Sequence, residues 1–202
     1  MATKKSELQD IYDKYRYDKN IAKKSKVWFE QQVTLLSKKR ITPNMIINND
    51  PKDVKSPNSI MPGKLYMYFY DPKLKKELPY YDRFPLVFPF RKLEDGWLGL
   101  NMHYLPHKLR LTLMDRLLVF ANNDKWDATT KLKYSWGLID GVSKFKIAEP
   151  CVKRYLVNHV RSPLVNVTAD NWATAMMLPV ERFVKATKQE VWQESTIKAR
   201  QR

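Results

Sequence analysis

The clearest hydrophobic pattern in the chain lies at residues 106–121 and predicts an amphipathic helix. Apolar residues recur there at helical spacing, at Leu109, Leu113, Met114, Leu117, Leu118 and Ala121. Charged residues, Arg110 and Asp115 among them, take the opposite face. Pro106 suits the first turn, because the N–H that proline lacks would have no partner there. We therefore expect a helix that packs on a core through its leucines.

Aromatic and β-branched residues earlier in the chain predict strands instead. Residues 64–70 read KLYMYFY, and two further apolar runs, 85–93 and 97–105, flank the turn signal Glu94-Asp95-Gly96. Two apolar runs around such a signal are typical of a β-hairpin. The sequence therefore predicts three strands before the first long helix.

The register of this hairpin follows from its apolar residues. A two-residue turn at Asp95-Gly96 would mix polar and apolar side chains on both faces. A three-residue loop with Gly96 in the left-handed region pairs Phe90 with Leu100 and keeps one face apolar, so we expect this register. Because proline cannot donate to a ladder, Pro85 and Pro89 predict an edge strand with both prolines turned outward.

The later segments complete the predicted architecture. Residues 129–139 predict a short helix, residues 151–160 a further helix, and residues 164–168 a short strand. The fold class that we expect is α+β, with a small antiparallel barrel-like sheet, formed mainly by residues 63–105, flanked by helices. Extended basic arms at both ends of the chain complete this picture.

Composition divides the chain into four parts. Residues 1–41 form a basic helical N-terminal arm, and residues 42–62 form a strap that is rich in proline and asparagine. Residues 63–183 hold all five glycines and form the α+β core domain. Residues 184–202 are polar and basic, and we expect a C-terminal tail there.

Net charge narrows the classes of partner. The 202 residues include 37 Lys and Arg against 21 Asp and Glu, which leaves +16. Such an excess indicates an anionic partner: nucleic acid, an acidic protein surface or a membrane face. The single cysteine excludes a disulfide framework and favours a reducing compartment. The chain holds no apolar run near 18 residues, so we expect neither a membrane span nor a signal peptide.

Motifs for metal or nucleotide chemistry are not present in the sequence. His103 and His107 are four residues apart, but Pro106 separates them into different elements, and Cys151 and His159 lack further ligands nearby. The sequence has no phosphate-binding glycine loop, no dinucleotide motif and no glycine-flanked nucleophilic serine. We therefore expect no metal, no cofactor and no catalytic residue.

The loop at residues 71–85 offers the one arrangement that an enzyme would use. Asp71, Glu77 and Asp82 are the acids that a Mg²⁺-dependent nuclease would need. Four basic residues are interleaved with them, which makes a poor cation site, so we expect a structured loop instead.

The aromatic residues of the same loop support an ordered conformation. Large aromatic side chains such as Tyr80, Tyr81 and Phe84 favour packing over exposure, and the prolines of the loop restrict its backbone. We expect at least two of these three aromatic side chains to be largely buried.

Basic residues interleaved with tyrosines and a tryptophan make the N-terminal arm the main candidate for partner binding. This pattern suits phosphate contacts and base stacking, but it also suits a solvated amphipathic helix that packs on a neighbour. A smaller basic cluster lies in the 71–85 loop. The candidate nucleic-acid or partner-binding residues are Lys4, Lys5, Lys14, Arg16, Lys19, Lys23, Lys24, Lys26, Trp28, Lys38, Lys39, Arg40, Lys73, Lys75 and Lys76.

Several long strings in the chain resemble a known family. They are GKLYMYFYDPKLKKELPYYDRFPLVFPF (63–90), GWLGLNMHYLPHKLR (96–110), CVKRYLVNHV (151–160) and MLPVERF (177–183). They are similar to small basic proteins of T-even-type tailed phages, the myoviruses of marine bacteria and cyanobacteria. The resemblance implies a virion-associated role, and some members are labelled DNA-end protectors. It implies no catalytic residue.

Two functions of different classes follow from these observations. We expect a non-enzymatic structural component of a tailed-phage particle, assembled in the host cytoplasm, that docks on other virion proteins through its core and basic arms. The alternative is a protein that binds DNA ends or packaged double-stranded DNA through the basic arms. Neither function involves a membrane or a small-molecule substrate.

Overall fold

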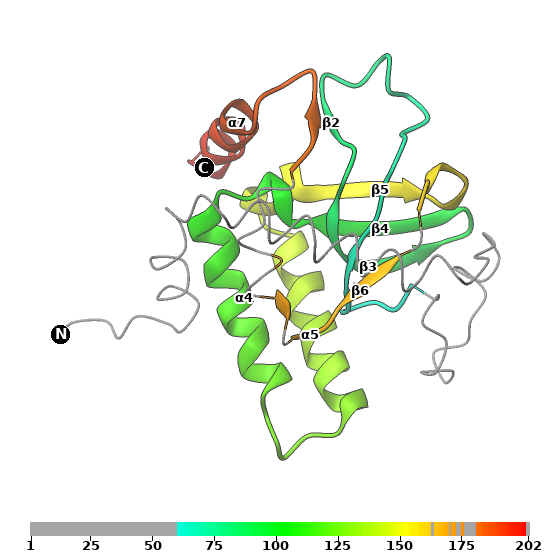
Figure 1. The fold of residues 1–202 in the computed structure, drawn as a ribbon. Helices are drawn as coiled ribbons and strands as arrows, with labels where there is room; N and C mark the ends of the chain where they lie inside the picture. Colours follow the sequence, from blue (N-terminus) through cyan, green and yellow to red (C-terminus); the bar gives the residue numbers. More distant parts are fainter. Residues whose placement is uncertain (1–59, 163, 170, 173–174, 176–180, 201–202) are drawn as a thin grey trace.

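The structure is a computed structural model that describes residues 60–200 except 163, 170, 173–174 and 176–180 (Figure 1). The basic N-terminal arm and nearly all of the strap lie outside the described residues. The twelve candidate binding residues of that arm lie outside them too. The described part contains most of the predicted core domain and residues 184–200 of the predicted C-terminal tail.

Five strands form an antiparallel sheet in the order β5-β4-β3-β1-β6. Their bounds are β1 Leu65–Met67, β3 Leu86–Leu93, β4 Gly96–Asn101, β5 Val152–Leu156 and β6 Val165–Val167. A separate pair joins β2 (Tyr81–Asp82) to β7 (Phe183–Val184). Because β5 and β6 are free edges of the sheet, it is antiparallel as expected but does not close into a barrel.

Helices accompany this sheet, so the expected α+β class is confirmed. The long helices are α4 (His107–Ala121), α5 (Ala128–Ser143) and α7 (Lys188–Arg200). Short 3-10 helices are η1 (Met102–Tyr104), η2 (Lys146–Cys151) and η3 (Val157–His159). Figure 1 shows α4 and α5 side by side as a hairpin that projects from the sheet. Helix α5 is four residues longer at its C-terminal end than the sequence predicted.

Alternating strand residues fill two apolar clusters, so both faces of the sheet are buried. Leu86, Phe88 and Leu100 belong to the cluster that includes the leucines of α4. Tyr66 and Val87 point the other way, into a cluster dominated by tyrosines. The apolar residues of the central strands are therefore divided between two different interiors, while Arg91, Lys92, Arg154 and Asn166 of the sheet are exposed.

The β3–β4 hairpin has the predicted apolar face but a different register. Phe88 pairs with Leu100, whereas the sequence pattern paired Phe90 with Leu100. The register shifts between Pro89 and Arg91, and the turn contains only two residues. From Val87 to Pro89 the register differs from the predicted one by two residues, so these side chains keep their faces; between the bulge and the turn it differs by one. Phe88, Phe90 and Leu100 still share one cluster.

The prediction that β3 is an edge strand was wrong. It lies at the centre of the sheet, between β4 and β1. Its prolines are tolerated because β1 pairs only with Leu86 and Val87. The carbonyl of Pro89 accepts a hydrogen bond from the backbone N–H of Gly63, at 2.9 Å. This contact requires no N–H from Pro89, so the missing donor of the proline costs nothing there.

The predicted helix at residues 151–160 was also wrong. These residues form strand β5, which pairs along β4, and the 3-10 helix η3. Gly96 permits this pairing, because a Cβ atom there would lie 1.8 Å from the carbonyl oxygen of Tyr155. The available edge of β4 therefore decided a segment whose local pattern favoured a helix.

Helix α4 confirms the predicted apolar stripe, with one correction. Arg110, which the pattern placed on the polar face, is fully buried. Its guanidinium donates to Glu181 Oε1 at 3.1 Å and to the carbonyl of Leu105 at 3.2 Å. A carboxylate from a distant segment therefore turned a predicted surface arginine into a core residue.

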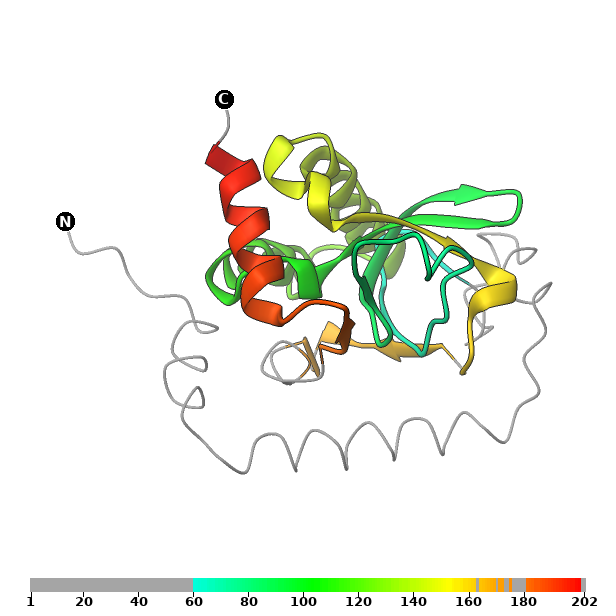
Figure 2. The same cartoon turned by 90° about the horizontal axis from the view of Figure 1, so that it is seen from above.

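Residues 188–200 form helix α7 and are not an extended tail. Val191 and Ser195 are buried, and Ser195 Oγ donates to the carbonyl of Tyr104 at 2.9 Å. Trp192 Nε1 donates to the carbonyl of His103, at 2.8 Å. Figure 2 shows α7 beside α4 and the segment that leads into β5. The segment therefore belongs to the packed body.

Candidate nucleic-acid interface

Only three of the predicted binding residues, Lys73, Lys75 and Lys76, lie in the described part of the chain. All three are exposed on the loop between β1 and β2. Lys75 forms an ion pair with Asp71 at 3.0 Å, so part of its charge is already compensated. Lys73 lines a cavity beneath the loop, while Lys75 and Lys76 are not among the cavity residues. The cluster is therefore divided between solvent and a cavity.

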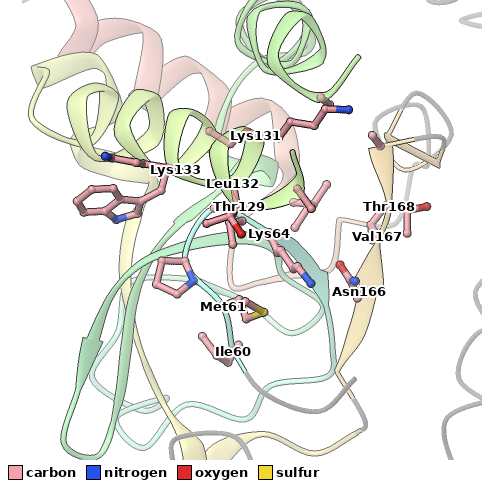
Figure 3. Close-up of a pocket in the computed structure, with 18 of the residues that line it drawn as sticks. Ile60, Met61, Lys64, Thr129, Lys131, Leu132, Lys133, Asn166, Val167 and Thr168 are labelled. Atoms are coloured by element: carbon pink, nitrogen blue, oxygen red, sulfur yellow. The ribbon is translucent and has the colours of Figure 1, made fainter. Parts of the chain in front are cut away.

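A larger basic feature is a groove of about 590 Å³ beside the first half of α5. Four lysines line it, Lys64, Lys92, Lys131 and Lys133, and we call it the lysine-rimmed groove. Figure 3 shows Lys64 between α5 and β6, with the amino groups of Lys131 and Lys133 directed to opposite sides of α5. None of the described residues that line this groove is acidic.

Close packing of the turn before β1 against α5 holds the groove in shape. Gly63 has a φ of 88°, and a Cβ atom there would lie 2.9 Å from the carbonyl oxygen of Leu132. Trp136 Nε1 donates to the carbonyl of Phe90 at 2.8 Å, which ties α5 to the bulged part of β3. A glycine is therefore required where the chain enters β1, directly before Lys64.

The groove combines positive charge with an apolar floor. Ile60 and Met61 are buried there, and Leu132 and Trp136 contribute apolar surface from α5. Partial burial lowers the pKa of Lys64. Lysines that rim such a surface suit phosphate groups, because the ammonium groups contact the anion while sugar carbons contact the floor.

A second cavity, of about 470 Å³, lies between the 71–80 loop and the end of β5. We call it the tyrosine cavity, since five tyrosines line it: Tyr70, Tyr80, Tyr81, Tyr104 and Tyr155. Lys73, Lys153 and Arg154 are its basic lining residues. Rings and cations together are the composition of a site for an aromatic, anionic ligand.

Hydrogen bonds fix several of these rings. Tyr80 donates its hydroxyl to Glu194 at 2.6 Å, and Tyr70 accepts from the backbone N–H of Leu156 at 3.0 Å. The ammonium of Lys153 lies 4.3 Å from the centre of the Tyr104 ring. Burial lowers the pKa of Lys153.

The aromatic residues of the 71–85 loop are less buried than expected. Phe84 is buried, but Tyr80 and Tyr81 are only half-buried because they face the tyrosine cavity. The prediction that at least two of the three are largely buried therefore holds fully for Phe84, while Tyr80 and Tyr81 are partly buried. The loop itself is ordered, as the sequence indicated.

The three acids that a nuclease would have used do not converge. Asp82 is buried and contacts His103 at 2.7 Å, whereas Asp71 is half-exposed and pairs with Lys75, and Glu77 is exposed. Across the described residues, no group of three potential metal ligands comes together. The three acidic residues of this loop therefore differ in exposure and in the groups that they contact, and they do not form a common site.

Sequence reasoning missed most of the residues that line these two features. Lys131 and Lys133 lie in a predicted helix, but only the packing of α5 places them beside Lys64. Lys153 and Arg154 lie in a segment that was predicted to be helical. An interleaved pattern of cations and aromatic residues around Tyr155 was the one signal available for them.

Comparison with known proteins assigns the chain to a family. No curated protein and no solved structure matches it. The described helices were also compared with the length and hydropathy of a membrane span, and none of them is long and apolar enough to cross a membrane. Residues 8–198 match the model of the family described as "Phage T4 terminal DNA protecting protein", in agreement with the resemblance to T-even-type phage proteins. The chain therefore belongs to the Phage T4 terminal DNA protecting protein family.

Proposed function

We propose that this protein binds the ends of linear double-stranded DNA and shields them from degradation. The observation that carries this proposal is the family match over residues 8–198, because the family description names terminal DNA as the object of protection. The match favours DNA-end binding, the alternative of the sequence analysis, over a purely structural role. The net charge of +16 supports an anionic partner.

The lysine-rimmed groove supplies the described surface that fits a DNA backbone best. Its lysines come from the residue before β1, from β3 and from α5, so they are spread around an opening rather than along one helix. Contacts to phosphates carry charge and no sequence information, which suits a protein that must recognise any DNA end. The basic residues of the N-terminal arm extend this proposed interface.

Binding and protection can be measured with linear and closed circular DNA of the same sequence. We expect linear DNA to compete for the protein and circular DNA to compete poorly, and we expect bound ends to resist a double-strand exonuclease. Replacing Lys64, Lys131 and Lys133 with glutamine should weaken binding to all sequences alike. The salt dependence should become shallower by roughly 0.9 for each phosphate contact that is lost.

A matched control removes the same charge elsewhere. Lys108, Arg116 and Lys146 are exposed and line neither cavity, so their triple glutamine variant should keep most of the affinity for DNA ends. Equal competition by circular and linear DNA, or unprotected ends at saturating protein, would overturn the proposed function. Equal losses in the two triple variants would remove the groove as the interface.

A virion role is a second candidate, and the exposed end of the α4–α5 hairpin favours it. Phe120, Trp126 and Tyr134 pack together there, with Trp126 and Tyr134 stacked at 4.3 Å between ring centres. Tyr134 remains 49% exposed and Val119 67% exposed, so the cluster offers apolar surface to a neighbouring virion protein. Detection of the protein in purified particles, and its loss from them in a Val119→Glu, Tyr134→Glu variant, would support docking.

A further inference from the structure

Two side chains of the tyrosine cavity are free of the hydrogen bonds and ion pairs that hold several of the others, although the ammonium of Lys153 lies over the Tyr104 ring. Tyr81 is half-exposed, and within the described structure its hydroxyl makes no hydrogen bond and its ring stacks on no other ring. Lys153 is half-buried, and within the same part of the chain its ammonium makes no ion pair. One aromatic face and one cation are therefore available to a ligand in the cavity.

The remaining rings form a rigid wall around these two side chains. Tyr155 stacks on Trp97 at 5.9 Å between ring centres, and Tyr104 packs edge-on against Phe183 at 5.1 Å. Tyr70 and Tyr80 also belong to this wall, and the hydrogen bonds of their hydroxyl groups to Leu156 and Glu194 hold them in place. A preformed wall lowers the entropic cost of binding a flat ligand.

The charge balance of the cavity favours an anion. Asp95 is already paired, because Arg154 donates to both of its carboxylate oxygens at 2.9 and 2.8 Å. Asp82 is buried beneath the lining and its oxygens accept hydrogen bonds from protein groups. Lys73 and Lys153 both line the cavity, and neither forms a close ion pair within the described structure, although Glu194 lies near enough to Lys153, and Asp95 to Lys73, to act on their charges.

A nucleotide combines the two properties that these groups recognise. Its base is a flat aromatic ring that stacks on tyrosine, and its phosphate is an anion that pairs with lysine. The cavity of about 470 Å³ lies within the usual range of small-molecule sites. A base inside a duplex is stacked on both faces and has none free for a tyrosine, whereas an unpaired base can leave the stack and enter a cavity.

We propose that the tyrosine cavity takes the unpaired terminal nucleotide of a DNA end, with its base on Tyr81 and its phosphate at Lys153. This inference rests on the proposed function and names the part of the DNA that the protein recognises. A terminal nucleotide is the least costly to unstack, because it has a neighbour on one side only. Capture of that nucleotide explains how a protein distinguishes an end from continuous duplex without reading sequence.

Fluorescence of 2-aminopurine tests the inference directly. Duplexes carry this base as a single unpaired terminal nucleotide, on the 5′ or the 3′ strand, and a blunt duplex serves as the reference. We expect full-length protein to quench the unpaired base and to bind one overhang polarity about tenfold more tightly than the blunt end. Replacing Tyr81 with alanine should abolish both the quenching of the unpaired base and the tenfold preference over the blunt end.

Three further variants separate stacking from loss of structure. Tyr81→Phe keeps the ring and should keep the quenching, and Tyr134→Ala removes an exposed tyrosine outside the cavity and should have no effect. Wild-type protein should bind a terminal phosphate more tightly than a terminal hydroxyl, and the Lys153→Gln variant should lose this preference. Thermal melts of each variant verify that it is folded.

The outcomes separate this inference from the function on which it rests. If both duplexes bind equally and Tyr81→Ala quenches like the wild type, the cavity proposal is wrong while DNA-end binding stands. If neither duplex binds at low salt, the proposed function fails and the cavity proposal fails with it. If free deoxynucleotide binds the cavity but duplex ends do not, a mononucleotide site replaces the terminal-nucleotide proposal.

Discussion

The Asp82 carboxylate lies 2.7 Å from Nδ1 of His103, and both side chains are buried. The same carboxylate accepts hydrogen bonds from the backbone N–H of Phe84 at 2.9 Å and from Nδ2 of Asn101 at 3.2 Å. The backbone N–H of Arg182 donates to it as well, at 3.3 Å. Asp82 therefore joins the loop, the end of β4 and the start of β7.

Replacing Asp82 with alanine should destabilise the protein by about 3–5 kcal/mol, because several buried donors lose their acceptor at once. Urea unfolding measures the change. Asp71→Ala is the control, since Asp71 is half-exposed and its ion pair with Lys75 lies at the surface. Similar unfolding midpoints for the two variants would contradict the structural role of Asp82.

Glu181 should make stability fall in acid. Burial would raise the pKa of this carboxyl, but its hydrogen bond to His107 and the charge of Arg110 outweigh burial and hold the pKa well below the usual 4.5. The unfolded state therefore binds a proton before the folded state does. The stabilisation is fully present above about pH 4.5 and is lost as the pH falls further.

The Glu181→Gln variant isolates this effect. It should be less stable by about 3 kcal/mol at neutral pH, because it leaves a buried arginine without its counter-charge. Its unfolding free energy should change less with pH below 4.5 than that of the wild type. Parallel pH profiles for the two proteins would show that Glu181 is not the responsible carboxyl.

Cys151 should be inert in the folded protein. Its side chain is fully buried, and burial raises the pKa of the thiol to about 12. Almost no thiolate is therefore present at pH 8, and a reagent cannot reach the sulfur. Labelling with a coloured thiol reagent should proceed only in denaturant, at a rate set by unfolding. Rapid stoichiometric labelling of native protein would contradict this burial.

Two glycine substitutions should shift stability in opposite directions. Gly96→Ala places a Cβ atom against the backbone of β5 and should disrupt the β4–β5 pairing. Gly137→Ala lies in α5 with nothing within 4 Å of the new Cβ, so it should stabilise the helix by about 0.5–1 kcal/mol. Thermal melts of the two variants measure the shifts, and a destabilised Gly137→Ala would show that α5 is not a regular helix there.

The basic arm should contribute electrostatically to DNA binding. Replacing Lys23, Lys24 and Lys26 with glutamate should weaken binding to all DNA sequences and flatten the salt dependence, because phosphate contacts carry charge alone. Titrations at several salt concentrations measure both quantities. Unchanged affinity would indicate that the arm binds a protein partner through apolar contacts.

Helix α4 and the apolar face of the hairpin were predictable because they depend on side-chain periodicity alone. The leucine spacing of residues 106–121 is the spacing of one face of an α-helix. Phe88 and Phe90 are two residues apart, so they lie on the same face of a strand, and a register shift of two residues preserves that face. The exact register was not predictable, because a bulge between Pro89 and Arg91 leaves no mark in an alternating pattern.

The sequence by itself determined the family, the α+β class, the leucine helix and the positive charge, because each depends on local pattern or composition. Only the tertiary structure decided that residues 152–156 form a strand, since the deciding partner is the edge of β4. It also decided that Arg110 is buried, because Glu181 approaches from 71 residues away. The groove and the cavity also exist only in the tertiary structure. Their lysines and tyrosines come from segments far apart in the chain, and packing alone brings them together.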